Sequence, residues 1–579
     1  MKFFHVYNDK FYEGLAKNGL INKDTGFKIQ HCFAMPPEIK FNSLARKGGM
    51  LHSLIKENNI AFYVDRIAGG VTYHKYDFDR ELIREYTDLL GDWFLGFQLH
   101  ESGSNRRLSD WRKILRIMDG HKGPYDAKKI RELNTRGYAK MPDGTALPGF
   151  SQDTPEVYAK MRYVETPEEY FEEMKDLFSR RMAEVEGKIL PCDSFYLATK
   201  LQDECGINTF MPEVGSQIPL MRIEVALARG MAKATNKTWG TYYECWRVDE
   251  DRNYIPTMPC FNSDPSNEWY LTQELHPDDF TSFGENGGSS RLLQNRIYYY
   301  SLMAGAQYMG EEWGLNCSYS DMNEFTLSEY GIVKKNFINN ALNFQGIKAR
   351  VPFAVVLPKK YSCVELVTVD AEYEIGKHRD KYMDCDLNNE EKAYYGHIED
   401  VLKLLYSRPE IYGNEGHVIT NSRFADVFDI IYEDASDEAL SKYEYLIDAT
   451  KEGSFLKSKA DKGLKILDSS DLTKLENELQ KLIKEVMPVY ADGLCWLVSE
   501  DENGSEYFSI FNNEGNKRSL EFGNTLNREA DKRVKVTFKE KANLEVVAEG
   551  NEKVTIEKID DYNYFVTVPA ASFAVVKFS

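Results

Sequence analysis

Four short apolar segments of the sequence end in glutamate, and this pattern constrains the fold more than any other. The glutamates that close them are Glu101, Glu213, Glu244 and the adjacent pair Glu311 and Glu312. A carboxylate at the end of a buried strand is costly unless a partner neutralises it. In α/β barrels, however, the chemistry takes place at the carboxyl ends of the strands. The pattern therefore predicts an α/β barrel enzyme with acidic strand ends.

The first 348 residues alternate short apolar runs with helical patterns, which favours βα units around a parallel sheet. Eight strands are required to close such a barrel. The predicted strands lie near 3–8, 28–34, 60–66, 94–101, 189–194, 208–213, 239–245 and 305–311. The predicted helices include 45–57, 79–90, 166–186, 218–235, 289–303 and 325–342. We therefore predict a (β/α)8 TIM barrel over residues 1–348.

Two long insertions interrupt this barrel pattern. They follow the fourth and the seventh predicted strands, at 102–165 and 247–288. Long loops at the catalytic face of a barrel usually shape a binding site, although a plain surface excursion has the same sequence character.

A second α/β pattern begins near residue 349. Its predicted strands are 350–358, 428–432, 443–448 and 464–468, and its predicted helices are 389–406 and an amphipathic segment that Pro488 stops. We predict a flavodoxin-like α/β domain over 349–490, with a possible role in oligomerisation. It has no Gly-x-Gly-x-x-Gly motif and no phosphate loop, so we expect no bound nucleotide.

The last segment, 491–579, changes to a period of two. Apolar and polar residues alternate in runs such as 507–512, 534–538 and 564–568, with turn residues between them. This spacing predicts a C-terminal antiparallel β-sandwich.

Composition excludes several classes of function. The net charge of −20 leaves no basic footprint for nucleic acid and disfavours anionic membranes. The nine scattered cysteines include no Cys-x-x-Cys pair, which predicts free thiols, a cytoplasmic location and no metal site. No run is long and apolar enough for a signal peptide or a membrane span. Aromatic residues make up 13% of the chain, which suits either a sugar-handling surface or large cores.

The order of barrel, flavodoxin-like domain and β-sandwich resembles the family-42 β-galactosidases and related retaining (β/α)8 glycoside hydrolases. Local sequence supports the likeness at 98–101 (QLHE), 237–244 (KTWGTYYE) and 303–308 (MAGAQY). The chain also resembles related uncharacterised barrel proteins at 213–217 (EVGSQ) and 228–230 (ARG). The resemblance implies a trimer, with Glu101 as acid/base and Glu244 as nucleophile. His100 stands where the family has asparagine before the acid/base.

Glycosidic cleavage needs two carboxyl groups, one to protonate the leaving oxygen and one to attack or to activate water. Their separation is ~5–5.5 Å in a retaining enzyme and ~6.5–9.5 Å in an inverting one. Glu101 and Glu244 form the predicted pair, and Glu213 is the rival if the fifth strand is not real. The alternative for each glutamate is a structural ion pair, with Arg222, Arg229 or Arg291 as the partner.

Sugar-binding residues are expected near the same strand ends. The candidates are Asp65, His100, Trp246, Glu311, Glu312 and Trp313. Of Glu311 and Glu312, we expect one to bind hydroxyl groups and the other to pair with an arginine. Neither a Gly-x-Ser-x-Gly nor a His-Glu-x-x-His motif occurs, so no cofactor or metal is predicted. The expected activity is an exo-acting glycosidase on small oligosaccharides or glycosides, with an inverting hydrolase, a lyase or a non-catalytic sugar-binding protein as alternatives.

Overall fold

The computed structural model describes most of the chain. The described residues are 1–7, 9–29, 48–67, 80–100, 167–193, 198–215, 221–244, 247–248, 254–255, 291–311, 318–321, 324–363, 389–407, 418–450, 453–459, 462–519, 523–526, 528–550 and 552–579. Within them, a few residues are described by their backbone alone, among them Asp65, His100 and Glu244.

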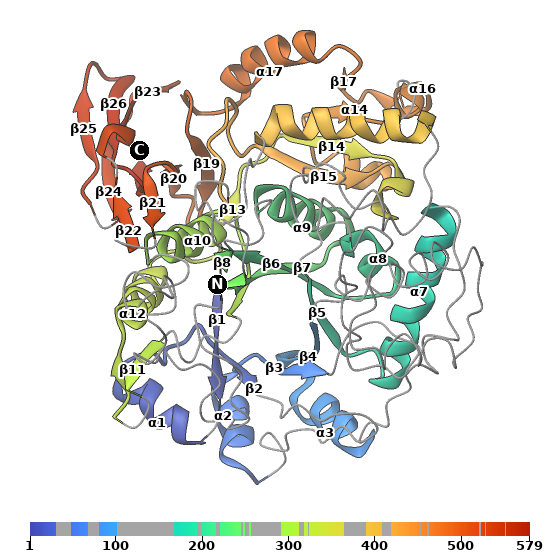
Figure 1. Cartoon of the computed structure of the whole chain (residues 1–579), viewed down its shortest axis with the longest axis vertical. Coiled ribbons are helices and arrows are strands. Elements are labelled where there is room, and N and C mark those ends of the chain that lie inside the picture. The colour runs from blue at the N-terminus through green and yellow to red at the C-terminus, as the bar shows by residue number, and fades with distance from the viewer. Residues whose placement is uncertain are drawn as a thin grey trace. The chain divides into compact units, whose positions relative to one another are not determined.

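Eight parallel strands close into a barrel in the order β1-β10-β7-β6-β5-β4-β3-β2 (Figure 1). Their bounds are β1 Lys2–Tyr7, β2 Thr25–Ile29, β3 Phe62–Ile67, β4 Phe94–His100, β5 Ile189–Asp193, β6 Thr209–Gly215, β7 Thr238–Glu244 and β10 Tyr308–Glu311. Seven of the predicted strands, including the fifth, coincide with β1, β3, β4, β5, β6, β7 and β10. Of the second, residues 28 and 29 lie in β2, and residues 30–34 lie outside the described residues. The second begins earlier than predicted, because the run from Thr25 to Ile29 is completely buried.

Helices follow most of these strands along the chain. Their bounds are α1 Asp9–Lys17, α2 Met50–Asn58, α3 Arg80–Leu90, α7 Pro167–Glu184, α8 Ala198–Glu204, α9 Met221–Thr235, α10 Arg291–Met303 and α12 Glu329–Ala341. The predicted start of the last helix at residue 325 was wrong. Residues Thr326–Leu327 form the short strand β12, which pairs with β11 (Tyr319–Asp321), and the side chain of Ser328 then caps α12.

A second sheet has four parallel strands in the order β15-β14-β16-β17. Their bounds are β14 Phe353–Leu357, β15 Phe428–Tyr432, β16 Tyr445–Asp448 and β17 Ile466–Asp468. The helices of this region are α14 Asn389–Tyr406, α15 Asp437–Leu440, α16 Ser454–Lys459 and α17 Leu472–Val486. Helix α17 has the predicted amphipathic pattern, because Leu475, Leu479, Leu482 and Ile483 are its buried residues.

The C-terminal part forms two antiparallel sheets, β13-β19-β20-β27-β24 and β18-β23-β26-β25. Their bounds are β13 Lys348–Ala349, β18 Val489–Ala491, β19 Cys495–Glu500, β20 Glu506–Phe511, β23 Lys532–Phe538, β24 Leu544–Glu549, β25 Thr555–Lys558, β26 Asn563–Val568 and β27 Phe573–Phe578. Two small hairpins, β8-β9 and β21-β22, complete the described strands; they are Arg247–Val248 with Tyr254–Ile255, and Asn516–Ser519 with Gly523–Leu526.

The chain divides into two compact units. The first contains residues 1–27, 212–358 and 397–579, and the second contains 28–211 and 359–396. Within the first unit, helix α9 packs directly on strand β15 (Figure 1). Gly230 permits this approach, because a Cβ atom there would clash with the carbonyl oxygen of Ile430.

Candidate active site at the barrel strand ends

The predicted site residues fall at the ends of barrel strands wherever the structure describes them. Glu244 is the last residue of β7, His100 is the last of β4, and Asp65 lies in β3. Four further predicted residues lie outside the described residues; they are Glu101, Trp246, Glu312 and Trp313. Side-chain geometry is therefore described for two of the predicted residues, Glu213 and Glu311.

Glu213 lies in β6, two residues before the strand ends at Gly215. Its side chain is buried, with 2% of its surface exposed. Burial of an ionised carboxylate is costly unless it is paired or hydrogen-bonded, so such a residue is a candidate for either function or a specific structural contact.

Glu311 closes β10 and is held from two sides. The ammonium group of Lys334, on α12, lies 2.5 Å from Glu311 Oε2. The hydroxyl group of Tyr298, on α10, donates a hydrogen bond to Glu311 Oε1. Gln294 Nε2 donates in turn to the Tyr298 hydroxyl oxygen at 2.7 Å. Burial, and then the neighbouring Glu311 carboxylate, raise the pKa of Tyr298 well above its usual value, so the phenol remains a donor.

Lys334 also reaches beyond Glu311. Its Nζ donates to Ser318 Oγ at 2.5 Å and lies 5.7 Å from the centre of the Phe3 ring. His5, two residues along β1 from Phe3, is buried in the same region. Burial, followed by the charge of Lys334, lowers the pKa of His5 to about 3. His5 is therefore neutral at physiological pH, and Glu311 and Lys334 provide the opposite charges of the cluster.

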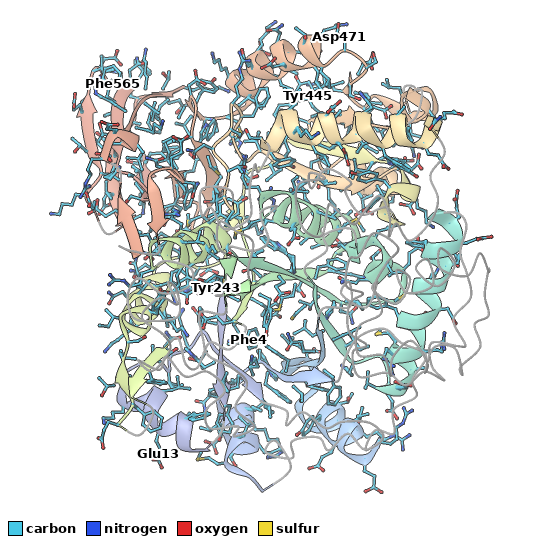
Figure 2. All side chains as sticks on the ribbon, in the orientation of Figure 1. Phe4, Glu13, Tyr243, Tyr445, Asp471 and Phe565 are labelled. Atoms are coloured by element: carbon cyan, nitrogen blue, oxygen red, sulfur yellow. The ribbon has the colours of Figure 1, made fainter. Side chains whose placement is uncertain are left out.

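One face of β7 is directed at helix α10. Thr241 Oγ1 donates to Ser301 Oγ at 3.1 Å. The ring of Tyr243 meets the ring of Tyr298 edge-on, with 6.1 Å between centroids; Figure 2 labels Tyr243. Side chains alternate across a strand, so positions 241 and 243 share the face that packs on this helix.

Two arginines that could have held the strand-end glutamates bind elsewhere. Arg222 donates from Nη1 to the carbonyl oxygens of Tyr406 and Thr420 and to Ser422 Oγ. Arg229 donates to Asp429 Oδ1 and to the carbonyl oxygen of Phe428. The motif 228–230 thus joins α9 to β15, and Gly230 supplies the close approach between them.

The sequence did not single out Lys334, Tyr298 or His5. The run of three tyrosines from Tyr298 to Tyr300 is the sequence feature that could have indicated Tyr298. All three are buried in α10, and a buried phenol normally needs a hydrogen-bond partner. Within the described ranges, no group of three histidine, cysteine, aspartate or glutamate residues could hold a metal ion. In the same ranges no helix is both long and apolar enough to cross a membrane.

No protein-family model and no curated protein sequence matches the chain. Among solved structures, it is similar to α-L-fucosidase isoenzyme 2 from Paenibacillus thiaminolyticus, with a TM-score of 0.45, 10% identity and coverage of 99% of this chain and 96% of that one. It is also similar to a β-galactosidase from Rahnella sp. R3, with a TM-score of 0.41, 8% identity and coverage of 100% and 98%.

A debranching enzyme from Nostoc punctiforme matches with a TM-score of 0.19, 12% identity and coverage of 91% of this chain and 88% of that one. All three TM-scores are below 0.5, so these similarities do not assign a fold or an activity. The barrel follows from the strand pairing of this chain, and a closed eight-stranded parallel barrel is consistent with the resemblance to (β/α)8 glycoside hydrolases.

Proposed function

We propose that the protein is an exo-acting glycoside hydrolase, which removes sugar units from the ends of small oligosaccharides or glycosides. The observation that carries the proposal is a closed parallel barrel in which β6, β7 and β10 each end in or near a glutamate. In barrel enzymes this edge carries the catalytic groups. The local resemblance to retaining β-galactosidases supplies the reaction class.

We propose Glu244 as the nucleophile and Glu101 as the acid/base. Thr241 and Tyr243 share the face of β7 that packs on α10. Position 244 is the last of β7, at the strand end where barrel enzymes carry their catalytic groups. Glu213 is the rival for either role, because it is a buried carboxyl group near the end of barrel strand β6.

The pairing of Glu311 supports a division of roles at the end of β10. Lys334 and Tyr298 already bind both of its carboxylate oxygens. We therefore propose Glu312, and not Glu311, as the ligand of sugar hydroxyl groups. The other proposed sugar contacts are Asp65, His100, Trp246 and Trp313.

The domain boundaries belong to the same proposal: a catalytic barrel over 1–348, a flavodoxin-like domain over 349–490 and a β-sandwich over 491–579. The four-stranded parallel sheet and the two antiparallel sheets support these boundaries.

A homotrimer is what the family resemblance implies for the assembly. Among the described side chains, Cys192, Cys205 and Cys495 form no disulfide, which supports a reducing, cytoplasmic environment.

Hydrolysis of a panel of aryl glycosides by the wild type and by Glu101→Gln, Glu213→Gln and Glu244→Gln tests the proposal. Glu557→Gln serves as the control, since Glu557 forms an exposed pair with Arg533. We expect one sugar to be cleaved, and two of the three variants to lose ~10³-fold or more of kcat while they remain folded. An inactive wild type, or full activity in all variants, contradicts the proposal.

The stereochemistry of the product separates retention from inversion. Proton NMR of the first-formed sugar shows the anomer directly. Retention supports the carboxylate pair proposed above, whereas inversion favours the alternative with a water between more widely spaced carboxyl groups. Sugar binding without turnover would favour the non-catalytic alternative.

A further inference from the structure

Helix α9 carries a buried arginine that uses only part of its hydrogen-bonding capacity. Arg222 lies in the first turn of α9 and is 1% exposed. Its Nη1 donates to the carbonyl oxygens of Tyr406 and Thr420 and to Ser422 Oγ. Its Nε and Nη2 have no hydrogen-bond partner among the described residues. A guanidinium group carries its N–H donors in a rigid planar fork, so the donors on these two nitrogens cannot turn toward the acceptors of Nη1.

An unpartnered acceptor belongs to the same buried cluster. Asp426, which lies just before β15, is 1% exposed. Its Oδ2 accepts a hydrogen bond from Tyr300 at 2.6 Å and lies 3.6 Å from Arg229 Nη1. Its other oxygen, Oδ1, has no hydrogen-bond partner in the part of the chain that the structure describes. Buried polar atoms are normally hydrogen-bonded, because water no longer solvates them. The unpartnered atoms are thus donors on Arg222 and an acceptor on Asp426.

Arg222 and Asp426 influence each other without a direct bond. No hydrogen bond of the guanidinium reaches the carboxylate, and the unpartnered atoms lie on both side chains. Burial lowers the pKa of Arg222, yet the nearby Cys495 and Asp426 raise it above its ordinary value. The guanidinium and the carboxylate are therefore near enough for their charges to interact, while their unpartnered atoms remain apart.

We propose that one buried water molecule bridges Arg222 and Asp426, accepting a hydrogen bond from the guanidinium group and donating one to Oδ1. Internal waters typically bind two to four polar groups that are otherwise unsatisfied. A water molecule matches both sets of atoms, because its oxygen accepts from N–H groups and its protons bind a carboxylate. A small anion would satisfy Arg222 alone and would meet the like charge of Asp426.

The proposed water site joins three parts of the first unit. Arg222 belongs to barrel helix α9, and Asp426 leads into β15 of the parallel sheet. The backbone N–H of Asp426 donates to the carbonyl oxygen of Trp496, in β19 of the antiparallel sheet, at 2.7 Å. The water is therefore a structural ligand of this junction. We assign it no role in substrate binding, so the inference stands or falls independently of the proposed glycosidase activity.

A high-resolution crystal structure of the wild-type protein tests the site directly. We expect one peak of electron density at roughly 2.7–3.2 Å from both Asp426 Oδ1 and an N–H group of Arg222, refined as oxygen. A direct ion pair between the two side chains, or no density between them, overturns the inference. An anomalous signal at this peak after a bromide soak would show a halide site and would refute the water.

Oxygen-17 magnetic relaxation dispersion counts long-lived internal waters in solution. Arg222→Met removes the donors and should lower the dispersion amplitude by about one water molecule relative to the wild type. Arg423→Met is the matched control, because Arg423 is exposed and pairs with Glu476. It should leave the amplitude unchanged. An unchanged amplitude in Arg222→Met, or an equal loss in both variants, contradicts the site.

Thermal unfolding of the wild type separates water from an anion even if Arg222→Met does not fold. The Tm is compared in sodium chloride and in sodium gluconate over the same range of ionic strength. We expect no rise in Tm that is specific to chloride and saturates with its concentration, because a water site does not depend on the anion present. Such a saturating rise would indicate bound chloride and would overturn the inference.

Discussion

Arg229 of α9 and Asp429 of β15 form a buried ion pair, with Nε 2.6 Å from Oδ1. Tyr443 donates to the other carboxylate oxygen of Asp429 at 2.9 Å. Asp426 lies 3.6 Å from Arg229 Nη1 and accepts a hydrogen bond from Tyr300 at 2.6 Å. The network joins a barrel helix to the parallel sheet, so these parts of the first unit should unfold together.

Removal of one partner of this pair should be strongly destabilising. We expect Asp429→Ala to lower the free energy of unfolding by about 3–5 kcal/mol, because it leaves Arg229 buried without its closest counter-charge. Denaturation by urea measures the change. Arg533→Ala is the control; its partner Glu557 is exposed, and the loss should stay below about 1 kcal/mol. Equal losses in the two variants would contradict the role given to the buried network.

Two helical glycines should respond in opposite ways to alanine. Gly230→Ala places a methyl group against the carbonyl oxygen of Ile430, and the backbone shift should cost about 1–3 kcal/mol despite the better helix propensity of alanine. Gly396→Ala, in α14, meets no atom within 4 Å and should be neutral or stabilising by up to about 1 kcal/mol. Thermal unfolding of both variants distinguishes packing from propensity.

His5 should make the fold sensitive to acid. Its pKa is about 3 in the folded protein and 6.5 as the ordinary value, so the unfolded chain binds the extra proton first as pH falls. Above pH 6.5, His5 is neutral in both the folded and the unfolded chain and does not make the free energy of unfolding depend on pH. As the pH falls from 6.5 toward 3, the free energy of unfolding decreases by up to about 1.4 kcal/mol per pH unit. His5→Asn should show a flatter dependence of unfolding free energy on pH over that window. Identical slopes in the two proteins would refute this assignment.

Glu204 should make the free energy of unfolding depend on pH in a second, more acidic range. Burial alone would raise the pKa of this carboxyl, but hydrogen bonds from Lys175 and Lys359 prevail and lower it to about 2. A depressed carboxyl pKa stabilises the fold above the ordinary value of 4.5, and this stability is lost as pH falls from 4.5 toward 2. Glu204→Gln should lose stability at pH 7 and show a weaker pH dependence below 4.5.

Chemical rescue should identify the nucleophile. If Glu244 forms the glycosyl-enzyme intermediate, Glu244→Gly with an activated aryl glycoside and azide should release a glycosyl azide of inverted configuration. An acid/base variant such as Glu101→Gly should instead give an azide of retained configuration, because its nucleophile is intact. NMR of the products decides the roles. A rescued inverted product from Glu213→Gly would transfer the nucleophile role to Glu213.

Periodicity was sufficient to predict the barrel strands, because apolar runs report local burial and burial of neighbouring residues along a strand is a local property. The same reasoning predicted α17 from the spacing of its leucines. It failed where pairing between two strands competed with the helical pattern of the sequence. Residues 326–327 have no helix-breaking chemistry, and the pairing of β12 with β11 moved the start of α12 to Glu329.

The roles of the strand-end carboxylates could not be read in this way. The sequence marks Glu311 as acidic and strand-terminal, which suits both sugar binding and a structural pair. In the folded protein Glu311 forms an ion pair with Lys334, which lies 23 residues later in the chain. Arg229 meets Asp429 across 200 residues of chain. Partners so distant in sequence leave no local pattern, because the free energy of an ion pair depends on spatial separation and burial, which arise only when the chain is folded.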